Sequence, residues 1–173
     1  NKDCGALFPE NLARRVKRYK ADMGFAFDGD ADRLIAVDEN GNTVNGDVII
    51  CSLAKYFNKL GLLNDNTVVG TSHTNMAIED ELKKDNITLI RTDIGDKYVL
   101  QKLIEKNLSL GGEQSGHVIL KNLATTGDGI LTALMLTEEI CDSKLTLAEL
   151  ASEVTLYPQF TKNIRVADKN NVF

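Results

Sequence analysis

Hydrophobic positions in this chain recur with two spacings, one typical of helices and one typical of strands. Apolar residues three or four positions apart predict helices over residues 9–20, 47–60, 75–84, 96–107, 127–141 and 146–154. Short apolar runs bounded by turn residues predict strands over residues 22–27, 34–37, 43–44, 67–70, 87–91, 108–110 and 117–120. Because strands and helices alternate, we expect a three-layer α/β domain with a mixed, largely parallel sheet. The C-terminal part of a similar domain is expected before it.

Turn and cap residues mark several of these boundaries. Pro9 suits a first helical turn, and Gly61 suits the end of the helix before it. Asn75 and Thr146 are suitable N-caps for the helices that follow them. Asn40-Gly41 lies between two apolar runs, which predicts a β-hairpin.

The chain divides into three predicted parts. Residues 1–45 hold the end of one α/β unit, and residues 46–156 form a second unit. Residues 157–173, which begin Tyr157-Pro158-Gln159, are interpreted as a connector towards a further domain. Both ends look cut, because the chain does not begin with methionine and stops after a strand-like run. We therefore expect a piece of a longer protein.

Composition narrows the class of protein. Hydrophobic residues make up 43% and charged residues 26% of the 173 positions, which is typical of a globular protein with a real core. The net charge is −5, and the sequence has no basic stripe of the kind that binds nucleic acid. We therefore do not expect nucleic acid as a partner. No signal-peptide pattern or apolar run long enough for a membrane span is present. Cys4, Cys51 and Cys141 are odd in number and widely spaced, which favours reduced thiols, with Cys51 and Cys141 in the core.

The segment Asp28-Gly29-Asp30-Ala31-Asp32-Arg33 follows an apolar run and places three carboxylates at alternate positions. On an extended or loop backbone alternate side chains point the same way, so the three can converge. Converging carboxylates repel each other unless a cation lies between them, and hard oxygen ligands suit Mg²⁺, Mn²⁺ or Ca²⁺. We predict a divalent-metal loop with Asp28, Asp30 and Asp32 as ligands.

Three other interpretations of this loop stay open at this point. The first is a solvated acidic turn. An EF-hand would begin at Asp28 and end at Glu39, but it would put Arg33 where the loop needs glycine, and residues 34–37 read as a strand. A phosphatase-type loop would use Asp28 as a nucleophile and would leave Asp32 and Arg33 without a role.

The segment Gly111-Gly112-Glu113-Gln114-Ser115-Gly116-His117 is a second candidate site. Its glycines let the backbone approach a ligand closely. On an extended backbone Glu113 and Ser115 point the same way, which suits two neighbouring sugar hydroxyls. An incidental glycine-rich turn is an equally open interpretation. A nucleophilic pair of Ser115 and His117 would need an orienting group and an oxyanion site that the sequence does not reveal.

Three further polar segments precede predicted helices. Thr125-Thr126-Gly127-Asp128-Gly129 offers backbone N–H groups that could bind an anion, although capping by Asp128 explains it equally well. Gly70-Thr71-Ser72-His73-Thr74-Asn75 is interpreted as a βα turn near a ligand. Gly95-Asp96-Lys97-Tyr98 offers Lys97 as a cation that could face a phosphate group.

Together these motifs resemble the α-D-phosphohexomutase superfamily, and within it the bacterial phosphoglucosamine mutases. Residues 28–33 resemble the magnesium loop of the family, and residues 112–117 resemble its sugar-specificity loop, with Gln114 similar to the glucosamine branch. Residues 95–99 and 125–129 are similar to that branch too. The resemblance covers essentially the whole chain.

The resemblance implies an isomerase of the intramolecular phosphotransferase type. It would interconvert glucosamine 6-phosphate and glucosamine 1-phosphate through a phosphoserine enzyme and a bisphosphate intermediate. The implied cofactor is Mg²⁺, held by the three aspartates. The implied catalytic residues are Arg33, Lys97 and His117, and the implied substrate-binding residues are Glu113, Ser115, His117, Thr126 and Asp128.

The resemblance also implies a cytoplasmic enzyme that feeds UDP-N-acetylglucosamine and cell-wall synthesis. Its partner would be a hexosamine phosphate substrate, and neither nucleic acid nor a membrane is expected as a partner. The oligomeric state is left open, with a dimer of the full-length protein as one alternative. The phosphoserine loop and a second phosphate-binding loop of the family are expected outside this chain. The chain alone should therefore bind metal weakly and should not catalyse the mutase reaction.

One residue departs from the family pattern, and two other functions stay open. Asp93 stands where related mutases often carry lysine, so an acid/base role is not assigned to it. A phosphomannomutase or phosphoglucomutase sibling is one alternative function. A non-catalytic domain that binds metal or sugar phosphate is the other.

Overall fold

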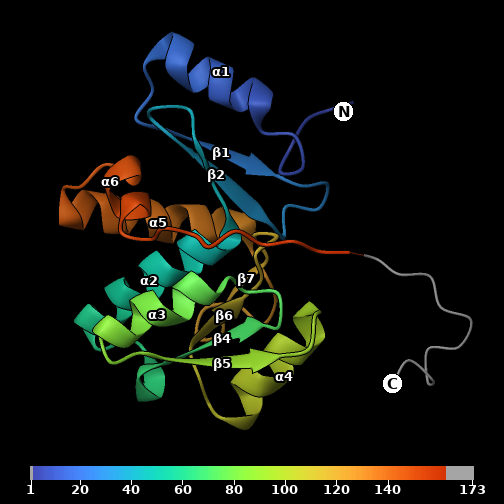
Figure 1. Cartoon of the computed structure of the whole chain (residues 1–173), viewed down its shortest axis with the longest axis vertical. Coiled ribbons are helices and arrows are strands. Elements are labelled where there is room, and N and C mark those ends of the chain that lie inside the picture. The colour runs from blue at the N-terminus through green and yellow to red at the C-terminus, as the bar shows by residue number, and fades with distance from the viewer. Residues whose placement is uncertain (1, 163–173) are drawn as a thin grey trace, which may run out of the picture.

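Short apolar runs form two separate sheets in the computed structural model, which describes residues 2–162 (Figure 1). The first sheet is antiparallel and contains β1 (Met23–Phe27), β2 (Leu34–Asp38) and β3 (Thr43–Val44) in that order. Gly41 adopts a φ of 82° in the turn between β2 and β3, a conformation that glycine tolerates without strain. The predicted hairpin at Asn40-Gly41 is confirmed.

Helices cover both faces of this first sheet. Helix α1 (Glu10–Tyr19) packs on β1 and β2 through a narrow apolar stripe that includes the buried Val16. Helix α5 (Gly129–Ser143) packs on the same two strands from the opposite side. Figure 1 shows α5 lying between the first sheet and helix α2 (Gly46–Leu60).

The second sheet has the order β5-β4-β6-β7. Strand β4 (Thr67–Thr71) pairs in parallel with β5 (Thr88–Thr92) and with β6 (Leu110–Gly112), whereas β7 (Val118–Leu120) is antiparallel to β6. The mixed, largely parallel sheet is therefore confirmed.

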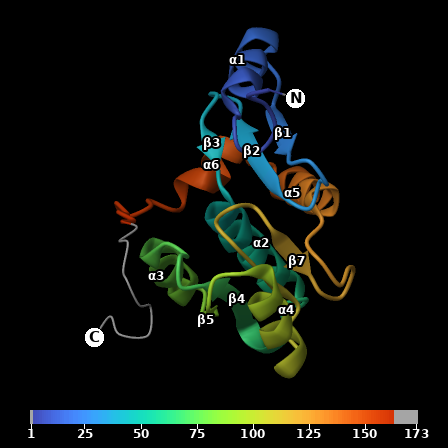
Figure 2. The same cartoon turned by 90° about the vertical axis from the view of Figure 1, so that its right-hand side faces the viewer.

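Helices on both faces of the second sheet make three layers (Figure 2). Helices α2 and α3 (Met76–Lys84) cover one face, and α4 (Asp96–Glu105) covers the other. Alternate residues of β4 serve the two faces: Val68 packs in the cluster with α2 and α3, and Val69 packs in the cluster with α4. The three-layer α/β domain is confirmed.

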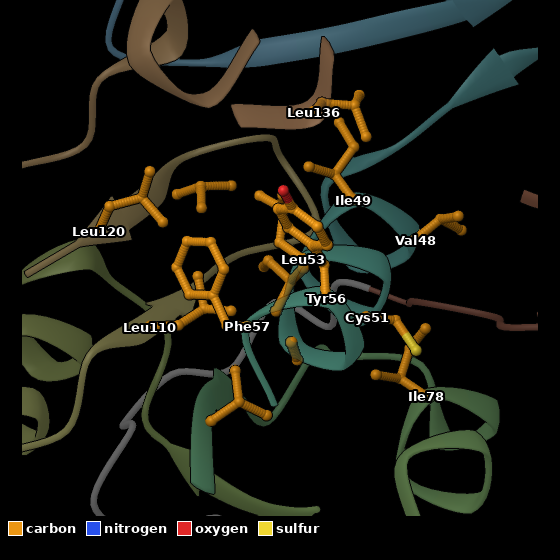
Figure 3. Close-up of a cluster of buried hydrophobic side chains, with 14 of the residues drawn as sticks. Val48, Ile49, Cys51, Leu53, Tyr56, Phe57, Ile78, Leu110, Leu120 and Leu136 are labelled. Atoms are coloured by element: carbon orange, nitrogen blue, oxygen red, sulfur yellow. The ribbon is translucent and has the colours of Figure 1, made fainter. Parts of the chain in front are cut away.

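One hydrophobic cluster connects the two sheets. It runs from Leu34 of β2 through Leu136 of α5 to Ile49 and Leu53 of α2, and on to Leu110 of β6. Figure 3 shows Leu136 above Ile49, with Leu53 and Leu110 further along the same cluster. The segments on either side of Asn45 therefore share a core.

Most predicted helix ends agree with the structure. Asn75 caps α3, Asp128 caps α5, and Thr146 opens α6 (Leu147–Ser152) with a capping box. The residue after α2, Gly61, adopts a φ of 71° and ends that helix.

Three details differ from the predictions. The strand expected at residues 108–110 lies at Leu110–Gly112, because its backbone pairs with β7 through the two glycines. A short 3-10 helix, η1 (Asn64–Asn66), precedes β4 without having been predicted. Cys141 is exposed rather than part of the core, whereas Cys51 is buried as expected.

Residues 157–162 follow α6 without regular secondary structure, and the strand-like run near residue 173 lies outside the described residues. Between residues 2 and 162, no helix has both the length and the apolar character that a membrane crossing requires.

Candidate active site

The loop between β1 and β2 brings its three aspartates together. One carboxylate oxygen from each of Asp28, Asp30 and Asp32 lies within 4.8 Å of the other two. Ala31, between the last two aspartates, adopts a left-handed φ of 60°, which is uncommon for a residue with a side chain. The loop therefore bends at Ala31.

Arg33 packs against the carboxylates it follows in the sequence. Its backbone N–H donates to Asp28 Oδ1 over 3.2 Å. Its Nε atom lies 3.6 Å from Asp28 Oδ2 and 3.8 Å from Asp32 Oδ1. The guanidinium group is only partly enclosed, with 42% of the side chain exposed, so it can also face a ligand.

The cluster is electrostatically unfavourable without a cation. Burial raises the pKa of Asp32, a side-chain contact with Asp28 and the charges of Asp28 and Asp30 raise it further, and His117 opposes the shift. Among the described residues, the buried Asp32 Oδ1 atom has no hydrogen-bond partner. Three clustered carboxylates with an orphaned oxygen fit a hard divalent cation, for which Asp28, Asp30 and Asp32 would supply the ligands.

The glycine-rich loop between β6 and β7 is a tight turn rather than the extended segment expected from its sequence. Gly116 N–H donates to the Glu113 carbonyl over 3.0 Å and closes the turn. Gly116 adopts a φ of 93°, and a Cβ atom there would lie 2.1 Å from the carbonyl oxygen of Leu34. Only glycine permits this approach.

Backbone hydrogen bonds fix the glycine-rich loop to the end of the metal loop and to the start of α2. Leu34 N–H donates to the Gly116 carbonyl, and Gly46 N–H donates to the Gln114 carbonyl, each over 3.0 Å. Arg33 and His117 form an isolated antiparallel bridge beside them. The two predicted motifs, far apart in the sequence, therefore form one continuous wall.

A cavity of about 520 Å³ opens against this wall. It is bounded by both loops and by the C-terminal ends of β4 and β5, the edge where parallel sheets usually bind ligands. The lining residues are Asp32, Arg33, Thr71, His73, Ile94, Gly95, Asp96, Glu113, Gln114, Ser115 and His117.

Glu113 and Ser115 both face the cavity although the loop turns between them. Gly95 N–H, at the start of α4, donates to Glu113 Oε1 over 3.0 Å and holds that carboxylate in place. Ser115 is exposed to solvent. A carboxylate and a hydroxyl on one wall can bind neighbouring hydroxyl groups of a sugar.

His117 lies at the junction of the two loops and is almost fully enclosed. Its Nδ1 atom lies 3.0 Å from Asp32 Oδ2, and Gly127 N–H donates to its Nε2 atom over 3.2 Å. Only 4% of the side chain is exposed. His117 thus joins the metal loop to the segment before α5.

Three other predicted residues lie outside this cavity wall. The Nζ atom of Lys97 lies 4.6 Å from the centre of the Tyr98 ring. Asp128 caps α5 by accepting from Leu131 N–H over 2.8 Å. Thr126 is exposed beside it. Their functional roles stay predictions.

Ile94 and Asp47 are site-related residues that were not predicted. Ile94 lines the cavity two residues after β5 ends, and a position just beyond a parallel strand is one that sequence reasoning could have considered. Asp47 is fully buried, and its Oδ2 accepts from Asn75 N–H and from Gln114 Nε2 over 2.9 and 3.2 Å. It therefore supports the glycine-rich loop from behind.

The EF-hand interpretation does not agree with the structure. Leu34–Asp38 is a strand, and Glu39, which would be the last ligand, instead accepts from Ala148 N–H over 3.2 Å. The loop is not an EF-hand.

Comparison with known proteins gives a consistent family. Residues 45–157 match the profile of phosphoglucomutase/phosphomannomutase, alpha/beta/alpha domain III, and residues 7–41 match that of domain II. Phosphoglucosamine mutases from Campylobacter hominis and Thermotoga petrophila are 46% and 51% identical over 169 residues, which is 98% of this chain. The chain spans only 38% and 39% of the length of those two proteins.

Solved structures show the same fold. A putative phosphomannomutase from Thermus thermophilus superposes with a TM-score of 0.78 at 24% identity, over 88% of this chain and 35% of that one. An N-acetylphosphoglucosamine mutase from Aspergillus fumigatus, solved with GlcNAc-6P and magnesium, superposes with a TM-score of 0.75 at 20% identity, over 97% and 40%. The chain therefore belongs to the phosphoglucomutase/phosphomannomutase family, the α-D-phosphohexomutases.

Proposed function

We propose that this chain is the metal- and sugar-binding part of a phosphoglucosamine mutase. The full-length enzyme would interconvert glucosamine 6-phosphate and glucosamine 1-phosphate. The observation that supports this most is that Asp32 of the aspartate cluster and the Glu113–Ser115 turn border one cavity, in a chain 46–51% identical to phosphoglucosamine mutases.

The aspartates and Arg33 would serve phosphoryl transfer. Asp28, Asp30 and Asp32 would hold Mg²⁺, which supplies positive charge to a phosphoserine oxygen when bound. The guanidinium of Arg33 lies beside the same cluster, and its planar donors suit the oxygens of a phosphate group.

Glu113 and Ser115 would bind the hydroxyls of the sugar in two orientations. In the first, the sugar accepts a phosphoryl group from the serine and becomes a bisphosphate. The intermediate then reorients, and its other phosphoryl group returns to the serine. Glu113 is suited to both orientations because a backbone N–H holds its carboxylate in place while the ligand turns.

Several elements of this proposal lie outside the described site. The phosphoserine loop and a second phosphate-binding loop would come from other parts of the full-length protein. Direct contact of Lys97, Thr126 and Asp128 with substrate remains a prediction, and no acid/base role is assigned to Asp93. A cytoplasmic enzyme that feeds UDP-N-acetylglucosamine and cell-wall synthesis is part of the proposal.

The direct test is a coupled assay on a full-length protein that contains this sequence, with its serine phosphorylated and Mg²⁺ fixed. Turnover of glucosamine 6-phosphate is compared with that of mannose and glucose phosphates. We expect preference for the amino sugar, and we expect Ser115→Ala to raise KM more than Ser152→Ala, which alters an exposed serine on α6.

Other outcomes would change the proposal in defined ways. Preference for a neutral hexose phosphate would move the protein to a sibling mutase. If a folded, phosphorylated sample turned over none of these sugar phosphates, the remaining interpretation would be a non-catalytic domain that binds metal or sugar phosphate. Hydrolysis of sugar phosphates by the 173-residue chain alone, abolished by Asp28→Asn, would favour the phosphatase-type loop.

A further inference from the structure

Asp96 is a carboxylate of the cavity wall to which the proposed reaction gives no role. It is the first residue of α4, is exposed to solvent and lines the cavity. Within residues 2–162 its carboxylate takes part in no hydrogen bond or ion pair, and it lies outside the aspartate cluster of the metal loop. Asp96 is therefore available to a ligand in the cavity.

The cations of the neighbouring segments are engaged elsewhere. Arg33, which also lines the cavity, lies beside Asp28 and Asp32 of the metal loop. The Nζ atom of Lys97, the residue after Asp96, lies 4.6 Å from the centre of the Tyr98 ring. Asp96 thus adds a negative charge to the cavity that neither of these side chains offsets.

An unpaired carboxylate is unfavourable in a site for a sugar phosphate. The phosphate group is an anion, so a further negative charge in the same cavity weakens its binding. A cation on the substrate itself removes this disadvantage. The amino group of an amino sugar phosphate is protonated at neutral pH, whereas the phosphates of glucose and mannose carry no cation.

We propose that Asp96 is a specificity-determining residue that binds the ammonium group of the amino sugar. The proposal rests on the proposed function and names the substrate group that is selected. The ammonium group donates hydrogen bonds to the carboxylate, and the opposite charges strengthen them. With a neutral hexose phosphate the carboxylate stays unpaired, so Asp96 both favours the amino sugar and disfavours its competitors.

Gly95 connects Asp96 to the turn that would bind the sugar hydroxyls. Its N–H donates to Glu113 Oε1 over 3.0 Å, and Asp96 follows directly in the sequence. The start of α4 therefore holds one carboxylate in place and contributes the other. In glucosamine the amino group and a hydroxyl group lie on adjacent ring carbons, so one end of the helix serves both groups.

A carboxylate at the start of a helix also stabilises the helix, because it lies at the positive end of the helix dipole. Glu10 provides the matched control for this effect. It is the exposed first residue of α1 and does not line the cavity. Comparison of Asp96→Asn with Glu10→Gln therefore separates substrate selection from helix stabilisation.

The test uses the full-length protein with its serine phosphorylated and Mg²⁺ fixed. It measures kcat/KM for glucosamine 6-phosphate and for glucose 6-phosphate, the latter as an inhibitor if its turnover is too slow. In Asp96→Asn we expect kcat/KM for the amino sugar to fall about 10- to 100-fold, as when a hydrogen bond between charged groups is lost. The value for glucose 6-phosphate should stay within about threefold of wild type or improve.

Two further variants complete the test. Asp96→Glu keeps the negative charge and should lose less of the preference for the amino sugar than Asp96→Asn. Glu10→Gln should leave both kinetic values unchanged while it lowers stability in urea unfolding as much as Asp96→Asn does.

The outcomes separate this proposal from the function on which it rests. If wild type prefers glucosamine 6-phosphate and Asp96→Asn keeps that preference, the role of Asp96 is overturned and the mutase remains. An equal loss for both sugars in Asp96→Asn would also overturn it, because Asp96 would then act on the shared reaction or on the fold. Preference of wild type for glucose 6-phosphate, or turnover of neither sugar, would overturn the proposed function itself and this proposal with it.

Discussion

At the scale of single residues, Glu139 on α5 is a buried carboxyl group outside the candidate site. Ser52 on α2 donates to its Oε1 over 2.7 Å, and Oε2 has no partner among residues 2–162. Burial raises the pKa of Glu139 to about 7, although the hydrogen bond from Ser52 opposes the shift. Between pH 4.5 and about 7, Glu139 therefore keeps its proton in the folded protein and loses it in the unfolded chain.

This proton makes stability depend on pH. An unfolded glutamate titrates near 4.5, so the contribution of Glu139 is full below that pH and is lost as pH rises through 7. One pKa unit corresponds to about 1.4 kcal/mol, which limits the loss to about 3 kcal/mol. Glu139→Gln should remove this loss and be more stable than wild type at pH 8.5 in urea unfolding.

The exposed neighbour provides the control for this prediction. Glu138→Gln removes a carboxyl group from the solvent side of the same helix and should leave the pH profile unchanged. The account of Glu139 fails if Glu139→Gln loses stability between pH 5.5 and 8.5 as steeply as wild type does.

Residues such as Glu139 also show where prediction from sequence stops. Its partner Ser52 is 87 positions away, so no local pattern marks it as buried. The three aspartates, by contrast, lie in one short loop, and their convergence could be predicted from their spacing. Asp47 was missed for the same reason as Glu139, because Gln114, which it holds, is distant in sequence.

At the scale of elements, the close approach of the α2 backbone to the glycine-rich loop determines the position of that loop. Gly46 begins α2, and a Cβ atom there would lie 2.2 Å from the Glu113 carbonyl oxygen and 2.6 Å from the Gly116 nitrogen. The loop therefore depends on a glycine in another element. Caps at Asn75, Asp128 and Thr146 could be predicted because they are local, but this contact could not.

Gly46→Ala should displace the glycine-rich loop. Alanine is a better helix former than glycine, so any destabilisation must come from the collision of the added Cβ atom with the glycine-rich loop. We expect a loss on the order of 2 kcal/mol in urea unfolding and weaker sugar-phosphate binding in the full-length protein.

Gly29→Ala in the metal loop is the matched control. No atom lies within 4 Å of a Cβ atom built at Gly29, so this change should be nearly neutral in stability. If Gly46→Ala were equally neutral, the contact between α2 and the loop would not determine its position.

At the scale of the whole molecule, the two sheets share one core. Leu136 of α5 is 1% exposed and belongs to the cluster that joins β2 to α2. The division of the chain into residues 1–45, 46–156 and 157–173 stays a proposal, because sequence shows where a motif changes but not which helices pack across the change. Helix α5, from the second part, covers one face of the sheet in the first part.

A shared core predicts cooperative unfolding of the chain. Far-ultraviolet circular dichroism and calorimetry should report one coincident transition. Leu136→Ala should lower its free energy of unfolding by about 2–5 kcal/mol without splitting it. Two separate transitions, with Leu136→Ala shifting only one, would show that the parts fold independently.

The measurement that tests the central claim most directly is mutase turnover by the full-length protein with Asp28→Asn. The variant removes one carboxylate charge from the cluster with little change in shape. We predict that kcat falls about 100-fold or more, the size expected when one preorganised electrostatic contact is lost. Asp22→Asn, an exposed residue before β1, should stay within about twofold of wild type. Full turnover by Asp28→Asn would contradict a metal-dependent phosphoryl transfer at this loop.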